Sequence, residues 1–331
     1  MSQRARGFLG KSITTIKPVP PFDFELTAGY HTYFQGRYGT DSLTGACTGG
    51  CWTWATSWCW RRCGPSDRWK RQSWRFELQA DGLEADEAGL ATAQVAWLLG
   101  TGQGLTEFYA LARSDSALSA ITKRYYGLHL PHTASVFEAL VLAILGQQIA
   151  TNVARIIRTL MIESHGLREI FDGETYYAFP RPETLGGLSV DQLRGLKLSQ
   201  RKSEYVKGIA QEALENSPTG LKFLHDMPDE VAVQKVLELR GVGHWTAQWV
   251  LIRVMGRSDA LPRGDLALRR AVSRVYFGGS EISDSQLEEF SWRWSPWRTY
   301  AMVYLSPPSA AGWRRGFLEQ VHQVAGAPGP R

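Results

Sequence analysis

The segment from Leu239 to Ala247 constrains the fold of this chain more than any other. It contains a tight Gly-x-Gly turn, Gly241 to Gly243, between two stretches in which apolar residues recur every three or four positions, a spacing typical of helices. Glycine permits a sharp turn, and it lets backbone N–H groups approach an anion at the positive end of the second helix. The segment therefore predicts two helices joined by a hairpin that binds phosphate through its backbone.

A carboxylate follows this hairpin at a short distance along the chain. Asp265 comes twenty residues after Trp245 and directly before an amphipathic stretch that starts at Leu266. Aspartate is favoured at the N-cap of a helix, so capping alone explains its presence. A carboxylate near a reaction centre can also stabilise developing positive charge and activate water. The residues by themselves leave both roles open.

Four segments, taken together, resemble the helix-hairpin-helix glycosylase superfamily, and within it the alkylbase (3-methyladenine type II) DNA glycosylases. In chain order the segments are Phe137–Ile149, the hairpin at 239–247, Leu261–Ala271 and Ser295–Ala301. The run from Pro21 to Gly39 is also similar to the small α+β domain that precedes the helical part in this family.

The resemblance implies a mainly α fold, namely a two-lobed all-α helix-hairpin-helix body preceded by a small α+β domain. We expect four parts along the chain: a disordered tail at 1–20, the small α+β domain at 21–104, the helical glycosylase domain at 105–305 and a flexible tail at 306–331.

Residues 44–75 do not fit their surroundings, because they show neither a helical nor an alternating period. Cysteine and tryptophan crowd into this segment, at Cys47, Cys51, Trp52, Trp54, Trp58, Cys59, Trp60, Cys63, Trp69 and Trp74. One interpretation is an exposed tryptophan-rich patch. The C-x3-C spacing also admits a metal site, but structural zinc sites use tighter cysteine pairs, so we expect no metal and no other cofactor.

The genetic code offers a second interpretation of the same segment. Tryptophan has one codon and cysteine has two, so the codons from Cys51 to Arg61 are well constrained. Reading them from the third base of each codon gives a strand pattern, a glycine turn and a second strand pattern, as a β-hairpin needs. We hypothesise that 44–75 is a frame-shifted version of an ancestral hairpin, and genomic resequencing tests this hypothesis.

The resemblance implies a catalytic role for Asp265. Cleavage of an N-glycosidic bond builds positive charge on the sugar, and a nearby carboxylate stabilises that oxocarbenium-like state. Some relatives carry a lysine at the position of Trp245 and use its amine as a nucleophile. A tryptophan at this position therefore implies a monofunctional enzyme that uses water.

The resemblance also implies a pocket for the damaged base. Trp245, Trp297 and Tyr300 are expected to supply its aromatic walls. Alkylated purines such as 3-methyladenine and 7-methylguanine are cationic, and a cation over an indole face is attracted by ~0.5–2 kcal/mol.

DNA contacts are expected at two places. Gly241, Gly243 and Thr246 would bind the DNA phosphate. Gln147 and Gln148 end a very apolar helix, and in the family this loop inserts a side chain into the gap that a flipped base leaves. Gln147 and Gln148 are the candidate wedge residues, with Gln148 preferred, although a polar helix end explains the two glutamines equally well.

Composition agrees with this function class. The chain has 331 residues and a net charge of +5, which suits a polyanionic partner. No apolar run approaches the roughly 20 residues that a membrane helix needs, and the start lacks a secretory segment. We expect a monomeric, cytoplasmic, DNA-associated enzyme with no membrane contact, whose partner is double-stranded DNA containing damaged bases.

The leading functional interpretation is a monofunctional DNA glycosylase that releases alkylated purines in base excision repair. One alternative is a non-catalytic DNA-damage-binding relative that keeps the hairpin. Another is an inactive pseudoenzyme, if the anomalous N-terminal segment prevents folding. Release of free base from methylated DNA separates these interpretations.

Overall fold

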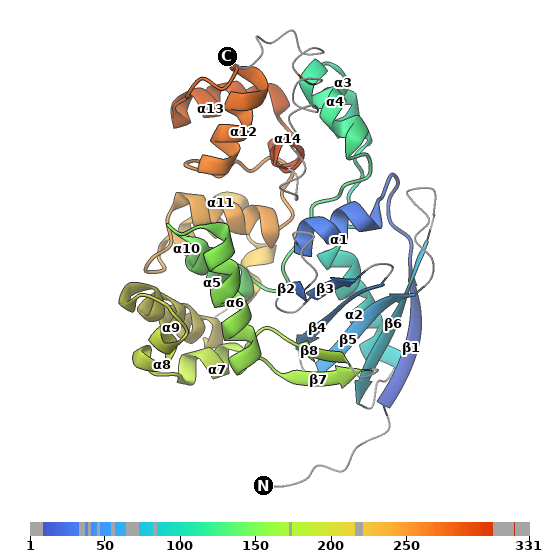
Figure 1. Ribbon diagram of the computed structural model, residues 1–331, viewed down its shortest axis with the longest axis vertical. Coiled ribbons are helices and arrows are strands. Elements are labelled where there is room, and N and C mark those ends of the chain that lie inside the picture. Colours follow the sequence, from blue (N-terminus) through green and yellow to red (C-terminus); the bar gives the residue numbers. More distant parts are fainter. Residues whose placement is uncertain are drawn as a thin grey trace, which may run out of the picture.

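The computed structural model describes residues 9–32, 37–38, 41–44, 47–53, 57–63, 73–81, 85–171, 174–215, 221–306 and 321. In this part of the chain a small sheet domain lies beside a larger body of helices (Figure 1). The predicted mainly α fold, with a two-lobed helical body behind a small α+β domain, is confirmed.

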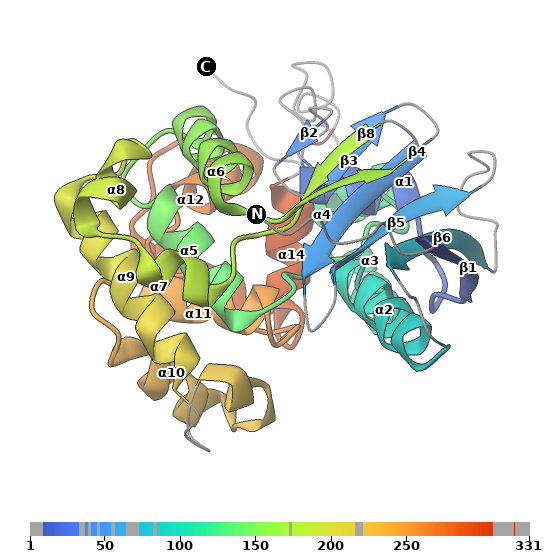
Figure 2. The same cartoon turned by 90° about the horizontal axis from the view of Figure 1, so that it is seen from below.

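The small domain is built on an antiparallel sheet with the strand order β1-β6-β5-β4-β3-β2. The strands are β1 (Leu9–Ile16), β2 (Arg37–Tyr38), β3 (Asp41–Thr44), β4 (Cys47–Thr53), β5 (Ser57–Cys63) and β6 (Trp74–Asp81). Helices α1 (Phe24–Thr32) and α2 (Ala85–Leu98) accompany it, and α2 packs against β1 (Figure 2). Alternate residues of β6, Trp74, Phe76 and Leu78, are buried, as expected when one face of a sheet covers a core.

The expectation of a disordered tail over 1–20 is wrong for residues 9–16. These residues form β1, whose eight positions pair with β6 from Leu9 opposite Asp81 to Ile16 opposite Trp74. The segment carries no strong local signal, because the exposed Ile13 breaks the apolar alternation. Its order comes from pairing with a strand that lies far along the chain. Residues 1–8 lie outside the described residues, as does the expected tail at 306–331 apart from Ser306 and Val321.

Much of the anomalous segment forms strands in the present reading frame. Strands β4 and β5 pair as an antiparallel hairpin in which Cys51 lies opposite Cys59 and Trp52 opposite Trp58. The sequence did not predict these strands, because no periodic pattern marks them. The frame-shift hypothesis stays a hypothesis. The side chains of the four cysteines lie outside the described residues, so the expectation of no metal there also stays a prediction.

The helices form two groups (Figure 1). One group contains α3 (Thr106–Arg113), α4 (Ser116–Arg124), α12 (Leu266–Tyr276), α13 (Asp284–Ser291), the short η2 (Trp292–Trp294) and α14 (Arg298–Leu305). The other contains α5 (Val136–Gly146), α6 (Thr151–His165), α7 (Pro182–Gly187), α8 (Val190–Gly195), α9 (Gln200–Leu214), η1 (Leu221–Asp226), α10 (Asp229–Leu237) and α11 (His244–Arg253). A short hairpin of β7 (Arg168–Phe171) and β8 (Glu174–Tyr177) leaves the second group and contacts β4.

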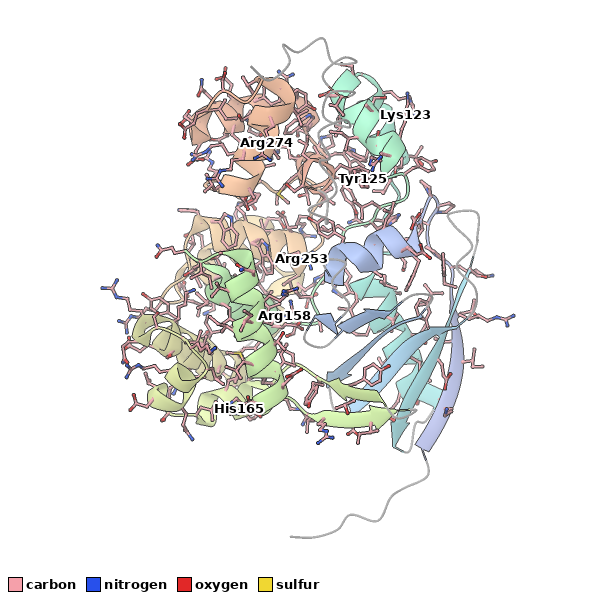
Figure 3. All side chains as sticks on the ribbon, in the orientation of Figure 1. Lys123, Tyr125, Arg158, His165, Arg253 and Arg274 are labelled. Atoms are coloured by element: carbon pink, nitrogen blue, oxygen red, sulfur yellow. The ribbon has the colours of Figure 1, made fainter. Side chains whose placement is uncertain are left out.

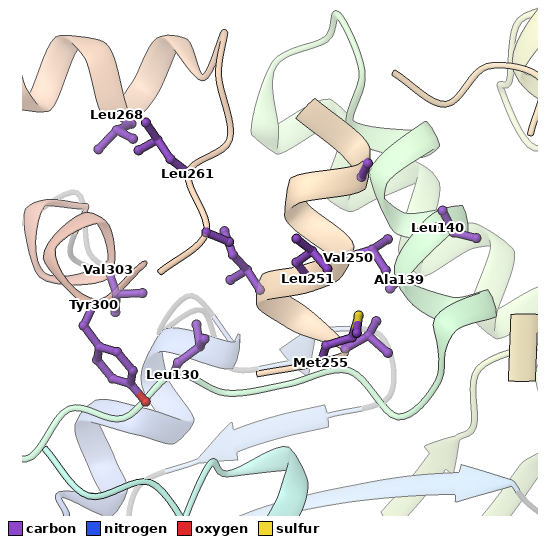
Figure 4. Close-up of a cluster of buried hydrophobic side chains, with 14 of the residues drawn as sticks. Leu130, Ala139, Leu140, Val250, Leu251, Met255, Leu261, Leu268, Tyr300 and Val303 are labelled. Atoms are coloured by element: carbon purple, nitrogen blue, oxygen red, sulfur yellow. The ribbon is translucent and has the colours of Figure 1, made fainter. Parts of the chain in front are cut away.

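The central helix of the second group is α5, which packs against α6, α9 and α11. Nine of its eleven residues are buried, which explains why the segment is apolar apart from Glu138. In Figure 4, Ala139 and Leu140 of α5 lie near Val250 of α11, and the core continues through Leu261 to Val303 of α14. Each fully buried aliphatic side chain of this kind contributes roughly 1.5–3 kcal/mol. A single core thus holds the two helical groups together.

Candidate active site

The glycine hairpin joins α10 to α11, and its two glycines differ in conformation and surroundings. Gly241 has φ +90°, a left-handed conformation, and a Cβ added to it would overlap the ring of Tyr205. Gly243 is the N-cap of α11 with φ −115°, and nothing lies within 4 Å of the position a Cβ would take. Gly243 and the following His244 are exposed. The turn thus presents the free N–H groups of a helix start at the surface.

Thr246 does not lie at this surface. It is 1% exposed, and its Oγ1 accepts a hydrogen bond from Gln147 Nε2 at 3.3 Å. The packing of α11 against α5 turns the Thr246 side chain inward, so the predicted phosphate contact of Thr246 is left to its backbone N–H. Contacts from the hairpin to an anion would come from the backbone.

Gln147 and Gln148 lie in different environments. Gln147 is half-buried, and its Nε2 also donates to the carbonyl oxygen of Gly241 at 3.0 Å. Its side chain is therefore a link between the α5–α6 loop and the hairpin, which corrects its assignment as a wedge. Gln148 is exposed, with φ +55°, an uncommon conformation for a residue other than glycine. Of the two residues, only Gln148 is exposed at the surface.

Asp265 caps α12 and contacts Trp245. Its Oδ1 accepts from the backbone N–H of Leu268 at 2.9 Å, and its Oδ2 accepts from Trp245 Nε1 at 3.1 Å. Gly264, with φ +80°, makes the turn that precedes it. The side chain is half-buried at the positive end of α12. The capping role is thus observed, and the same geometry fixes the carboxylate beside the first turn of α11.

The loop before Asp265 is fastened to α14 by a carboxylate–guanidinium pair. Arg298 Nε donates to Asp259 Oδ1 at 2.9 Å and Nη2 donates to Oδ2 at 2.8 Å, while Ser295 Oγ donates to Oδ2 at 2.9 Å. Burial raises the pKa of the Asp259 carboxyl, but these hydrogen bonds outweigh burial and leave the pKa lowered. A bidentate pair of this kind defines geometry well. It places the start of α14, and with it Trp297, against the loop that carries Asp265.

Two of the three expected aromatic walls are accessible. Trp245 and Trp297 are both half-exposed, and the Trp297 ring meets Tyr300 edge-on at 5.7 Å. Tyr300 is fully buried, and burial raises the pKa of its hydroxyl far above 10. Its assignment to the base pocket is corrected, because the inner side of α14 places it in the core near Leu130 (Figure 4).

A further pair of side chains continues the aromatic face of α11. Trp249 lies one turn after Trp245 with its ring nearly parallel, at 6.4 Å between centroids. The guanidinium of Arg253 lies 5.7 Å from the Trp249 ring, at the end of the helix nearest the small domain (Figure 3). Residues spaced by four share one helix face. This face starts at the hairpin and runs toward the interior.

Comparison with known proteins covers most of this helical body. Residues 141–296 match the profile described as HhH-GPD superfamily base excision DNA repair protein. The solved 3-methyladenine DNA-glycosylase from Archaeoglobus fulgidus is 26% identical, with a TM-score of 0.77, and the match covers 88% of this chain and 96% of that one. Residues 141–296 of this chain are thus similar to the HhH-GPD superfamily.

Curated relatives of the superfamily match in the same region. The DNA-3-methyladenine glycosylase of Bacillus subtilis (strain 168) is 30% identical over 201 residues, which is 61% of this chain and 66% of that protein. The DNA-3-methyladenine glycosylase 2 of Escherichia coli (strain K12) is 27% identical over 58% of this chain and 64% of that protein. The matched part is thus slightly less than two thirds of each relative's length.

The superfamily match contains Gln147, Gln148, the hairpin and Asp265, while Trp297 and Tyr300 follow directly after it. Sequence reasoning did not single out Lys202 and Tyr205 of α9, which contact the loop after α5 and the hairpin respectively. Only the tertiary structure reveals these two contacts.

The described residues hold neither a candidate metal site nor a membrane-spanning helix. No group of three histidine, cysteine, aspartate or glutamate side chains there is arranged to hold a metal ion. In the same residues, every helix is too short or too polar to cross a bilayer.

Proposed function

We propose that this chain is a monofunctional DNA glycosylase that acts as a monomer on double-stranded DNA. Its reaction is hydrolysis of the N-glycosidic bond of alkylated purines of the 3-methyladenine and 7-methylguanine class, as a step in base excision repair. The names of the curated relatives, which are DNA-3-methyladenine glycosylases, support the substrate class.

The observation that carries this proposal is the position of the Asp265 carboxylate. It is held by two N–H donors, from Leu268 and Trp245, next to the surface where the hairpin presents backbone N–H groups. A nucleotide whose phosphate sits on the hairpin would bring its sugar toward this carboxylate. The negative charge then stabilises the sugar cation as the base leaves, and an oxygen of Asp265 orients the attacking water.

Water as the nucleophile is supported by the residue at 245. An indole N–H cannot form a Schiff base, and Trp245 directs that N–H to Asp265. The reaction would release the free base and leave an abasic site in an intact strand.

Recognition of a cationic base is supported by the half-exposed indoles of Trp245 and Trp297. A cation over an indole face gains about 0.5–2 kcal/mol, whereas an undamaged, neutral purine lacks this attraction. The exposed Gln148 would fill the gap in the stack after the base leaves it.

Base release from methylated duplex DNA, resolved by chromatography, tests the proposal. We expect 3-methyladenine and 7-methylguanine to appear as free bases, and duplexes containing hypoxanthine or uracil serve as comparison substrates. Tight binding to an abasic-site duplex without any base release would instead identify a non-catalytic damage-binding protein. Release of deaminated bases alone would overturn the substrate class.

A further inference from the structure

Lys202 of α9 reaches the end of α5 from a neighbouring helix. Its Nζ donates to the carbonyl oxygen of Leu145 at 2.9 Å and to that of Gln147 at 2.7 Å. The last carbonyl groups of a helix have no partner within the helix, and a cation also interacts favourably with that end. The side chain is partly buried, and burial lowers the pKa of its ammonium. Lys202 thus acts as a cap supplied by another helix.

The loop that Lys202 caps is also tied to the hairpin. The backbone carbonyl of Gln147 accepts from Lys202, and the side chain of the same residue donates to Gly241 and Thr246. The next residue, Gln148, is exposed and has φ +55°. A left-handed conformation costs a residue other than glycine free energy, so it persists where its surroundings hold it. The bonds on Gln147 supply that support.

The same helix supports the hairpin directly. Tyr205, one turn after Lys202, packs so closely against Gly241 that a Cβ there would overlap its ring. Arg240, beside Gly241, stacks over the Tyr205 ring at 5.7 Å and pairs with Glu204 at 3.4 Å. Both elements expected to touch DNA, the loop with Gln148 and the hairpin, therefore rest on the first two turns of α9.

We infer that Lys202 is a positioning residue for base extrusion: by holding the Leu145 and Gln147 carbonyls, it keeps Gln148 at a fixed place relative to the hairpin. This inference rests on the proposed function for its consequence, although the loop geometry itself is independent of that function. Without the ammonium group of Lys202, the loop after α5 relaxes. Gln148 is then misplaced relative to a nucleotide bound at the hairpin. The step that suffers is extrusion of the base, and binding of the phosphate backbone is largely retained.

A direct contact from Lys202 to DNA phosphate makes a different prediction. Two of its three N–H donors are directed at carbonyl groups. If Lys202 contacted a DNA phosphate, its replacement would lower the affinity and reduce the salt dependence of binding. If Lys202 positions the loop, its replacement lowers the rate of base release at saturating enzyme. The affinity for DNA then stays near that of a variant that has lost an equal charge elsewhere.

The test compares Lys202→Met with Lys207→Met and Lys202→Arg. Lys207 lies on the same helix and also donates to a carbonyl, that of Leu188 at 2.8 Å, so its replacement removes an equal charge and a similar bond away from the loop. Hydrogen–deuterium exchange of a peptide spanning 143–149 reports the loop without DNA. Single-turnover base release at saturating enzyme, and affinity for a duplex with a tetrahydrofuran abasic analogue, report the consequence.

We expect Lys202→Met to speed exchange in this peptide and to slow single-turnover release about tenfold, with affinity within about threefold of Lys207→Met. Lys202→Arg, which keeps the donors, should restore both readouts. Equal exchange in the two methionine variants would overturn the inference, as would a loss of affinity with an unchanged rate. If the wild-type protein releases no base, the proposed function fails while the exchange comparison still decides the role of Lys202.

Discussion

Trp245 Nε1 donates a hydrogen bond to Asp265 Oδ2 at 3.1 Å, which joins the first turn of α11 to the N-cap of α12. Trp245 thus fixes the orientation of the Asp265 carboxylate. Because Leu268 N–H holds the other oxygen, the carboxylate cannot rotate without breaking a bond.

Asp265→Asn should abolish base release and leave DNA binding within a few-fold of wild type. The amide oxygen can still accept from Leu268 N–H, but its NH2 group faces the Trp245 N–H and the negative charge is gone. Preorganised electrostatic stabilisation of this kind is commonly worth a factor of ~10²–10³. Base release and gel-shift titration measure the two effects. Activity above about a tenth of wild type would point to another acid.

Trp245→Phe should slow base release at least about tenfold while the protein stays folded. The change keeps a flat apolar ring and removes the N–H donor to Asp265. A hydrogen bond to a charged group is worth ~1.5–3 kcal/mol, so its loss is measurable in the single-turnover rate. A variant as active as wild type would show that Leu268 alone orients the carboxylate.

Gly243→Ala should affect DNA affinity, whereas Gly241→Ala should affect the stability of the fold. The Cβ at 243 meets open space, so Gly243→Ala should fold normally and weaken binding to all DNA sequences alike. The Cβ at 241 meets the Tyr205 ring in a left-handed conformation, so Gly241→Ala should lower the melting temperature. Thermal melting and binding to unrelated duplexes separate the two. Weaker binding of one lesion type alone would argue against a backbone clamp.

The wild-type protein should leave the DNA strand intact. With Trp245 at the hairpin, no amine is available there for a Schiff base. Lesion-containing duplex is incubated with the protein and borohydride and then run on a denaturing gel. A trapped covalent complex, or nicking without heat or alkali, would contradict hydrolysis by water.

Stability should fall as the pH drops from about 6.5 toward 4, and His132 should account for part of the fall. His132 is 1% exposed and stacked on Trp97, and burial, together with the nearby Arg253, lowers its pKa to about 4. Below pH 6.5 the imidazole of His132 is protonated in the unfolded chain but stays mostly neutral in the folded chain until the pH reaches about 4. Acid therefore favours unfolding through this group, by at most about 3 kcal/mol at pH 4.

Urea unfolding at several pH values tests this expectation. His132→Gln keeps a donor for the Trp97 carbonyl, which His132 Nδ1 contacts at 2.7 Å, and it cannot titrate in this range. Its stability should therefore change less steeply with pH than that of the wild type. Equal slopes would show that folding does not lower the pKa of His132.

The sequence by itself determined the local features of this protein. The glycine turn at 241–243, the apolar helix that ends at Gly146 and the helix cap at Asp265 all appear where the residues predict them. Such features depend on residues within one or two turns of each other, through periodicity, capping and glycine conformation. A single sequence carries that information directly.

Only the tertiary structure decided which side chains face a ligand and which face the core. Gln147 joins a residue ninety-four positions away, Tyr300 is buried in α14, and β1 is ordered by its partner strand β6. The same residue types would suit a wedge, a pocket wall or a tail. Their roles follow from contacts between segments that are distant in the sequence. These contacts form only when the helices and strands pack together, so no local sequence pattern predicts them.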